Sequence, residues 1–93
     1  MTVGVLKLSL LVRGSRSLKE KRRHIKSVKD RIIARFKVAC AEVGRLDSLQ
    51  QAELAAAVVS NDGRHAAGIL SSILSVVRSH REVEVIDHEI ELL

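Results

Sequence analysis

The side chains best suited to chemistry in this sequence are lysines and arginines. Nine of the twenty-one residues from Ser17 to Lys37 are Lys or Arg, and only two are acidic. Such side chains bind phosphate groups through their charge and their hydrogen bonds. The segment therefore points to binding of a polyanion.

Charge is distributed unevenly along the chain. The whole sequence carries a net charge of +5, yet Arg13 to Lys37 holds eleven bases and two acids, and Arg81 to Leu93 holds one base and five acids. The first segment is therefore net +9 and the last net −4. We expect one side of the molecule to be basic and another acidic.

No constellation for catalysis or metal binding accompanies these bases. No histidine is paired with Cys or an acid at the spacing that metal ligation requires. Glu42 has no nucleophile placed beside it, and Ser60, Asn61 and Asp62 precede a helix, where they are expected to cap it. We expect no enzyme activity, no cofactor and no metal. The four histidines are expected at the surface: His24, His65, His80 and His88.

Composition indicates a single domain spanning residues 1–93. The apolar fraction is 46%, Phe36 is the one aromatic residue, and no Pro or Trp is present, so the core must be aliphatic. Cys40 cannot form an intramolecular disulfide, which favours a reducing cytoplasm. The apolar run from Val3 to Val12 is too short to span a bilayer, so no membrane partner is expected.

Periodicity places the strongly basic segment on a helix. Val3 to Arg13 alternates as a central strand, with a turn after it. Ser17 and Glu20 have the spacing of a capping box, in which Ser17 accepts from the Glu20 amide and Glu20 reaches back to the Ser17 amide. The core-facing stripe of this helix has spacings of seven, three, four and four: Leu18, Ile25, Val28, Ile32 and Phe36.

Most bases of this helix fall along one flank at 100° per residue. We name this flank the basic ridge, and it consists of Lys19, Arg22, Arg23, Lys26 and Lys29. The bases expected on the opposite flank are Lys21, Arg31 and Arg35.

Four further elements follow. Strands are expected at 37–43 and 49–60, separated by a polar turn, although the alanines of 49–59 leave a helical alternative that Val58 and Val59 disfavour. A second helix follows Asp62, with apolar residues at helical spacing from Ala66 to Val77. The end of the chain alternates twice, and the change of phase near Val85 predicts a β-bulge.

The predicted order β-α-β-β-α-β is that of the ferredoxin-like α+β fold. Right-handed crossovers place both helices on one face of a four-stranded antiparallel sheet with strand order 4-1-3-2.

Four segments resemble the YlxP-like family of small bacterial proteins, which contain domain of unknown function 503. They are SLKEKR from Ser17, AEV from Ala41, AVVSND from Ala57 and VEVIDHEIEL from Val83. The resemblance covers nearly the whole chain. It implies a ferredoxin-like fold and genes located among those of translation-initiation and ribosome-maturation factors, and it implies no established activity.

Two interpretations of the basic ridge stay open: a solvated helix face, or a surface for RNA or a ribosomal particle. The strands lack the aromatic residues on which RNA-recognition modules stack bases. An RNA would therefore have to be recognised through contacts with its phosphates and through its shape. Arg13 and Arg16 lie in the turn before the helix and extend the ridge, although this turn also has a purely structural explanation. Pairing of the ridge with acids of the last strand would remove the basis for RNA binding.

The face of the sheet away from the helices offers an alternative function. Alternation directs six apolar side chains to this open face, where they suit homodimerisation or another protein interaction. They are Val3, Val5, Leu11, Ala55, Ala57 and Val59. Acylphosphatase shares the topology, but the strand at 37–43 lacks the Asn that assists that enzyme and Arg13 to Ser17 lacks its glycine-rich loop, so topology alone supports no activity here.

Overall fold

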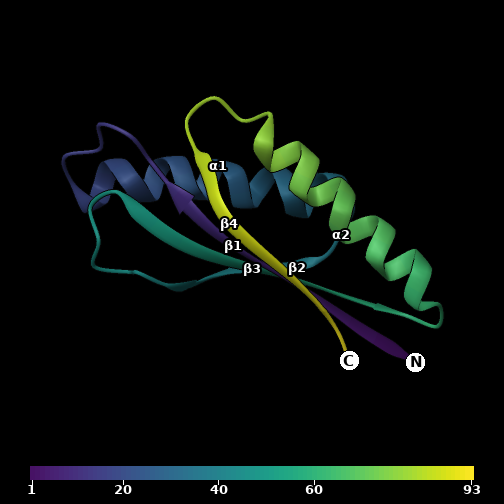
Figure 1. The fold of residues 1–93 in the computed structure, drawn as a ribbon. Coiled ribbons are helices and arrows are strands. Elements are labelled where there is room, and N and C mark those ends of the chain that lie inside the picture. The colour runs from purple at the N-terminus through teal and green to yellow at the C-terminus, as the bar shows by residue number, and fades with distance from the viewer.

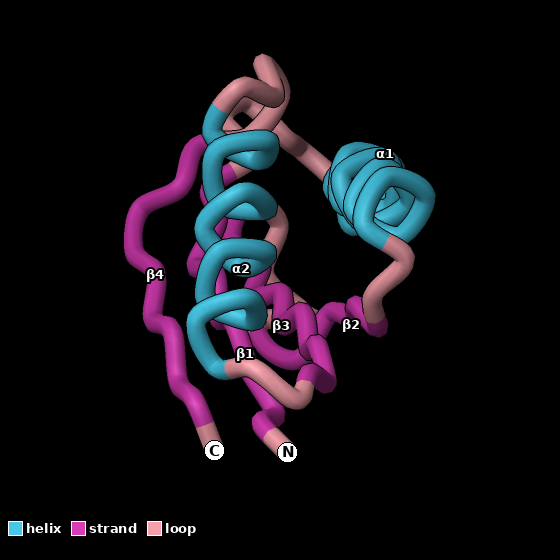
Figure 2. The backbone as a smooth tube through the Cα atoms, turned by 90° about the vertical axis from the view of Figure 1, so that its right-hand side faces the viewer, coloured by secondary structure: helices cyan, strands magenta, loops and turns pink.

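The computed structural model describes all 93 residues and contains six elements in the order β-α-β-β-α-β (Figure 1). Their bounds are β1 Thr2–Leu11, α1 Leu18–Phe36, β2 Ala39–Gly44, β3 Gln51–Ser60, α2 Gly63–Arg78 and β4 Glu84–Leu92. The four strands form one antiparallel sheet in the order β2-β3-β1-β4, which confirms the predicted ferredoxin-like topology. Both helices lie on the same face of this sheet (Figures 1 and 2).

Alternation along β1 divides the sheet into a core face and an open face. Leu6, Leu8 and Leu10 are buried beneath the helices, and the residues between them are directed to the open face. The helices contribute two apolar stripes to the same core: Ile25, Val28 and Ile32 from α1, and Leu70, Ile73 and Val77 from α2. Neither helix has the length and apolar character needed to cross a membrane.

Gly4 permits the close approach of α2 to β1. A Cβ atom built at Gly4 would lie 2.9 Å from Leu70 Cδ1, which is shorter than a normal carbon contact. A larger residue at this position would require the end of the Leu70 side chain to shift.

The sheet edges differ slightly from the sequence prediction. The strand expected at 37–43 begins at Ala39, because Lys37 takes the left-handed conformation (φ 55°) and its amide donates to Ile33 O at 2.8 Å, ending α1. The strand expected at 49–60 begins at Gln51, whose amide donates to Ser48 Oγ at 3.0 Å. Residues Gln51–Ser60 form a strand and no part of 49–59 is helical, which confirms the interpretation that Val58 and Val59 favoured. The predicted bulge is confirmed, because the pairing with β1 skips Ile86.

The connection between α2 and β4 contains a histidine that should make stability depend on pH. Burial lowers the pKa of His80, and Arg31 lowers it further, while Glu82 acts in the opposite direction. The folded state therefore disfavours the protonated imidazole. The neutral imidazole of His80 contributes stability that is fully present above the unfolded pKa of about 6.5. This contribution is lost as the pH falls through the lower folded pKa.

We expect His80→Gln to weaken the loss of stability on acidification. Urea unfolding measures the change in the free energy of unfolding between about pH 7.5 and about pH 5.5, which lie on either side of the unfolded pKa. His65→Gln on the exposed surface of α2 is the matched control, since the two variants remove the same side chain. Identical pH dependence in both variants would contradict a role for His80.

Candidate nucleic-acid interface

Local capping fixes where α1 begins and therefore which of its faces carries the basic ridge. Ser17 Oγ accepts a hydrogen bond from the Glu20 amide at 3.0 Å, as the capping-box prediction required. The reciprocal bond was predicted wrongly, because the Glu20 carboxylate accepts from the amide of Arg16 (3.1 Å), one residue earlier than expected. The first bond satisfies an amide that would be unpaired at the helix N-terminus, and the second holds the turn before the N-cap against the first turn of the helix. The helix thus starts at Leu18 in the phase predicted from its stripe.

Most cations of the basic ridge have no acidic partner within the chain. Lys26 pairs with Asp30 one turn later, with Nζ 2.5 Å from Oδ2. The other four form no ion pair. Glu84 of β4 and Glu82 of the preceding turn contact Arg13 and His24, which lie outside the ridge. Only Lys29 of the ridge is partly buried, and the rest is exposed: Lys19, Arg22, Arg23 and Lys26. Apart from Lys26, the ridge therefore has no compensating ion pair within the chain.

A hollow of about 210 Å³ lies between α1 and β2. Three ridge cations, Arg22, Lys26 and Lys29, line it together with Ile25 and with Glu42 of β2. Figure 2 shows α1 almost end-on, set to the side of the sheet where β2 forms the edge. Converging cations around a concavity provide a place where an anionic group can be contacted from several sides.

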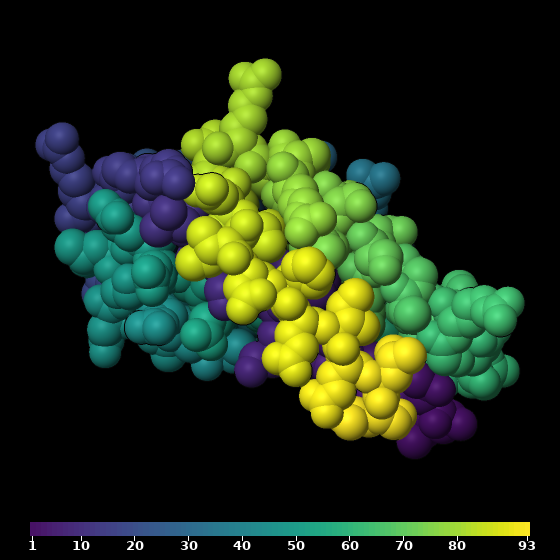
Figure 3. Space-filling model, viewed as in Figure 1, coloured from purple at the N-terminus to yellow at the C-terminus, as the bar shows by residue number.

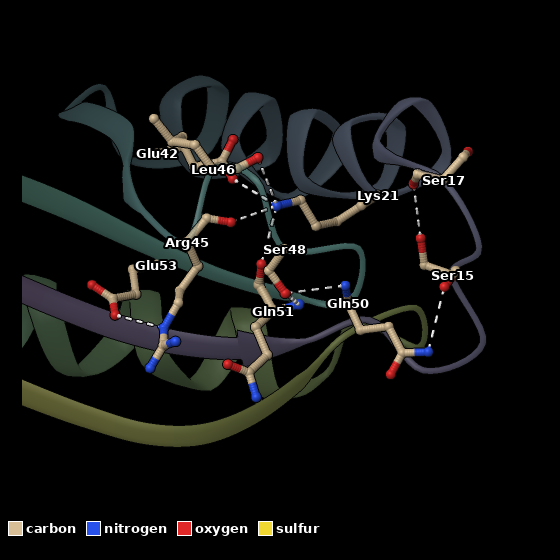
Figure 4. Close-up of polar contacts among 10 residues, drawn as sticks. All are labelled: Ser15, Ser17, Lys21, Glu42, Arg45, Leu46, Ser48, Gln50, Gln51 and Glu53. Atoms are coloured by element: carbon tan, nitrogen blue, oxygen red, sulfur yellow. Dashed lines mark hydrogen bonds and ion pairs between the residues drawn. The ribbon is translucent and has the colours of Figure 1, made fainter.

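Lys21 was predicted wrongly as a base on the opposite flank, and it is fully buried. Its ammonium donates to three backbone carbonyls, those of Arg45 (2.8 Å), Gln51 (3.1 Å) and Leu46 (3.4 Å), as Figure 4 shows. These carbonyls belong to the β2–β3 connection and the start of β3. Lys21 thus ties α1 to a loop more than twenty residues away in the sequence.

The sequence contained a signal for this burial. The apolar stripe of α1 has a gap of seven residues between Leu18 and Ile25, and Lys21 falls inside it at spacings of three and four. Lys21 therefore occupies a core position of the helix, where its aliphatic stem packs and its ammonium must find acceptors.

Glu42 balances the buried charge of Lys21. Its Oε2 lies 3.5 Å from Lys21 Nζ and is inaccessible to solvent, yet it accepts no hydrogen bond. The donors of Lys21 are directed to the three carbonyls, so the attraction between the two side chains is mainly coulombic. Glu42 also lines the hollow, so one carboxylate lies among its three cations.

The reactivity of the Cys40 thiol on β2 depends on its burial and on the charge of Lys29. Burial raises the pKa of the Cys40 thiol, and the nearby charge of Lys29 partly offsets that increase. We expect Cys40 to react with iodoacetamide more slowly at pH 8 than a cysteine in an unstructured peptide, since the thiolate is the reactive species. Lys29→Gln should slow alkylation further, whereas Lys19→Gln, distant on the same helix, should leave the rate unchanged. Equal rates in all three proteins would contradict this account.

The two arginines of the β1–α1 turn differ in their surroundings. Arg13 forms an ion pair with Glu84 at the start of β4, with Nη2 2.6 Å from Oε2, so its charge is compensated. Arg16 is exposed and its side chain forms no ion pair. Arg16 can extend the basic ridge, whereas Arg13, which follows β1, is held beside β4 by an exposed ion pair.

The open face brings together five of the six predicted interface residues. Val3 lies opposite Val59 and Val5 opposite Ala57 in the β1–β3 register, with Ala55 following on the same face. Val59 is 67% exposed and the others are half-buried. Leu11 lies at the other end of β1, separated from this strip by Lys7 and Ser9.

Comparisons with known proteins agree with this architecture. A de novo designed protein, Foldit4, matches with a TM-score of 0.57 and 15% identity over 100% of this chain and 97% of its own. A structural-genomics protein, YJCS, matches with a TM-score of 0.53 and 11% identity over 96% of each chain. These similarities support the fold alone. No curated protein matches the sequence.

The family comparison covers nearly the whole chain, since the model of DUF503, described as a protein of unknown function, matches residues 3–90. The chain therefore belongs to the DUF503 family.

Proposed function

We propose that this chain is a non-enzymatic cytoplasmic protein that binds structured RNA or a ribonucleoprotein through the basic ridge, in ribosome maturation or translation. The observation that carries the proposal is the basic ridge along one flank of α1, in which four of the five cations form no ion pair and two of these four, Arg22 and Lys29, line the hollow beside β2. Like charges this close repel one another, and an anionic partner relieves that repulsion. A solvated helix face of mixed sign would have no such need.

The available side chains favour contacts with the RNA backbone. Arg22 has a planar guanidinium that can bind a phosphate through two hydrogen bonds, and Lys26 and Lys29 lie on the same hollow. Phe36, the sole aromatic residue, lies near the end of α1 beside Arg35, away from the open face. Base stacking on the sheet therefore has no platform, and recognition would rest on phosphate position and the shape of the RNA.

Salt dependence provides the direct test. If four or five ridge side chains each neutralise one phosphate, log affinity for a helical segment of ribosomal RNA should fall against log salt with a slope of about −3 to −4.5. Fluorescence anisotropy between about 50 and 200 mM salt measures that slope. A slope near zero, or the absence of binding at the lowest salt concentration, would refute the proposal.

Self-association through the open face is a second candidate. The observation that favours it is the exposed position of Val59 beside Val3, Val5 and Ala57, an apolar strip that no helix covers. Sedimentation analysis of the protein and of Val59→Lys tests this candidate without RNA. A dimer that the substitution dissociates would support it, and a monomer at all concentrations would exclude it.

A further inference from the structure

The outer edge of β4 is a long strand edge with no strand beside it. β4 lies at one end of the sheet, and beyond its bulge at Ile86 it pairs regularly with β1 over the six residues from Asp87 to Leu92, whereas the opposite edge strand, β2, pairs regularly over only four, from Ala39 to Glu42. Edge strands with outward backbone groups can pair with another chain unless they are short, bulged or covered, and charged side chains along the edge restrict the pairing to strands of complementary charge. Figure 3 shows β4, in yellow, running uncovered along the surface of the molecule.

The hydrogen-bond pattern identifies the backbone groups of β4 that face away from β1. Val3 and Leu93 exchange both of their amide–carbonyl bonds. Because bonded and non-bonded pairs alternate in an antiparallel ladder, the amides and carbonyls of Leu92, Ile90 and His88 point outward. The amide of His88 agrees with this assignment, since it donates to Asp87 Oδ1 at 2.8 Å and to no strand, and a partner strand would displace that side-chain bond.

The side chains of β4 form two rows of different chemistry. One row, which we name the acidic row, lies on the open face and consists of Asp87, Glu89 and Glu91. None of the three forms an ion pair within the chain, although Lys7 lies opposite Glu89 on the inner side. The other row faces the helix side and leaves Ile90 37% exposed and Leu92 47% exposed.

These rows disfavour pairing with a second copy of β4. Antiparallel pairing centred on His88 would place Asp87 opposite Glu89 of the other chain, and parallel pairing would align each acid with its own copy. Like charges directly opposite one another destabilise a sheet. A strand with cations at alternate positions has the complementary pattern, with aliphatic residues between them to cover Ile90 and Leu92.

We propose that the outer edge of β4 binds an extended segment of a partner protein in which Lys or Arg alternates with aliphatic residues. The segment adds a fifth strand to the sheet, its outward amides and carbonyls pairing with those of His88, Ile90 and Leu92. Its basic side chains lie over the acidic row, and its aliphatic side chains lie on the opposite face. This inference stands on the edge and charges of β4 and does not depend on RNA binding.

The experiment uses the complete chain labelled with ¹⁵N and a peptide as long as β4 that alternates Lys and Val. Titration should shift the amide resonances of His88, Ile90 and Leu92 and protect them from hydrogen exchange. A peptide of the same composition with Lys and Val in blocks should bind at least about tenfold more weakly, because its charges fall on both faces. Equal binding of the two peptides would overturn the proposal.

Two sets of variants test the residues. The triple variant Asp87→Lys, Glu89→Lys and Glu91→Lys should weaken binding by at least about tenfold, whereas the triple variant Asp30→Lys, Asp47→Lys and Glu82→Lys, with the same change in charge, should bind normally. His88→Pro removes one outward donor at an edge position that tolerates proline, and it should also weaken binding. Equal weakening by both triple variants would show non-specific attraction. Concentration-dependent shifts of the same amides without peptide would instead identify a second copy as the occupant, and either result overturns the proposal.

Discussion

Lys21→Met should lower the free energy of unfolding by about 3–5 kcal/mol, the range typical for removing one partner of a buried ion pair. The substitution keeps the aliphatic stem but removes the ammonium that three carbonyls and the Glu42 carboxylate share. Those acceptors would remain buried without a donor, and each unsatisfied group is costly. Because small domains are stable by about 5–15 kcal/mol, this loss is a large fraction of the total stability. Urea denaturation followed by circular dichroism measures the change.

Two further variants separate the buried role of Lys21 from a general effect of losing charge. Lys19→Met removes an exposed lysine from the same helix and should change stability by no more than about 0.5 kcal/mol. The double variant Lys21→Met, Glu42→Leu removes both charges and should be more stable than Lys21→Met alone. If Lys21→Met cost no more than Lys19→Met, the network drawn in Figure 4 would contribute nothing to stability.

Reversal of the basic ridge should produce the largest change in binding. The variant in which all five ridge residues become Glu should bind helical ribosomal RNA at least about a hundredfold more weakly at 0.15 M salt, because cationic contacts provide most of such affinity. It should also fail to co-sediment with ribosomal particles. The substitutions are Lys19→Glu, Arg22→Glu, Arg23→Glu, Lys26→Glu and Lys29→Glu.

The control for this reversal changes the net charge by the same amount at other exposed sites. It consists of Arg31→Glu, Arg35→Glu, Arg64→Glu, Arg78→Glu and Arg81→Glu. Both variants shift the formal charge from +5 to −5, since each substitution changes it by two. Equal loss of binding in both would attribute the affinity to net charge and remove the ridge from the mechanism. Circular dichroism should show that both variants remain folded.

The order and pairing of the elements could be predicted because they depend on patterns within single segments. Alternation along Val3 to Val12 and the 3.6-residue periodicity of α1 and α2 each describe one element. The change of phase near Val85 located the bulge before any partner strand was known. Right-handed crossovers then left one arrangement of the strands. Positions on α1 follow from helical geometry, so the residues of the basic ridge could also be identified.

The contacts that the sequence could not reveal join residues far apart in the chain. Arg13 and Glu84 are 71 positions apart, and neither segment shows that the other is near. Lys21 resembles its basic neighbours in type, and its acceptors are backbone carbonyls of a connection, which carry no sequence signature. The seven-residue gap in the apolar stripe marked the position of Lys21. Only the positions of those carbonyls explain why a lysine can occupy a core position there.

Opposite charges lie at opposite edges of this sheet. The cations around the hollow are beside β2, and the unpaired carboxylates are on β4, three strand spacings away, or roughly 14 Å at about 4.8 Å per strand. The molecule therefore has a permanent dipole across the sheet, and the field of a polyanion would turn it before contact so that α1 arrives first. Encounters in the correct orientation should be frequent. The rate of association should fall steeply with salt concentration, because salt screens the field that orients the molecule.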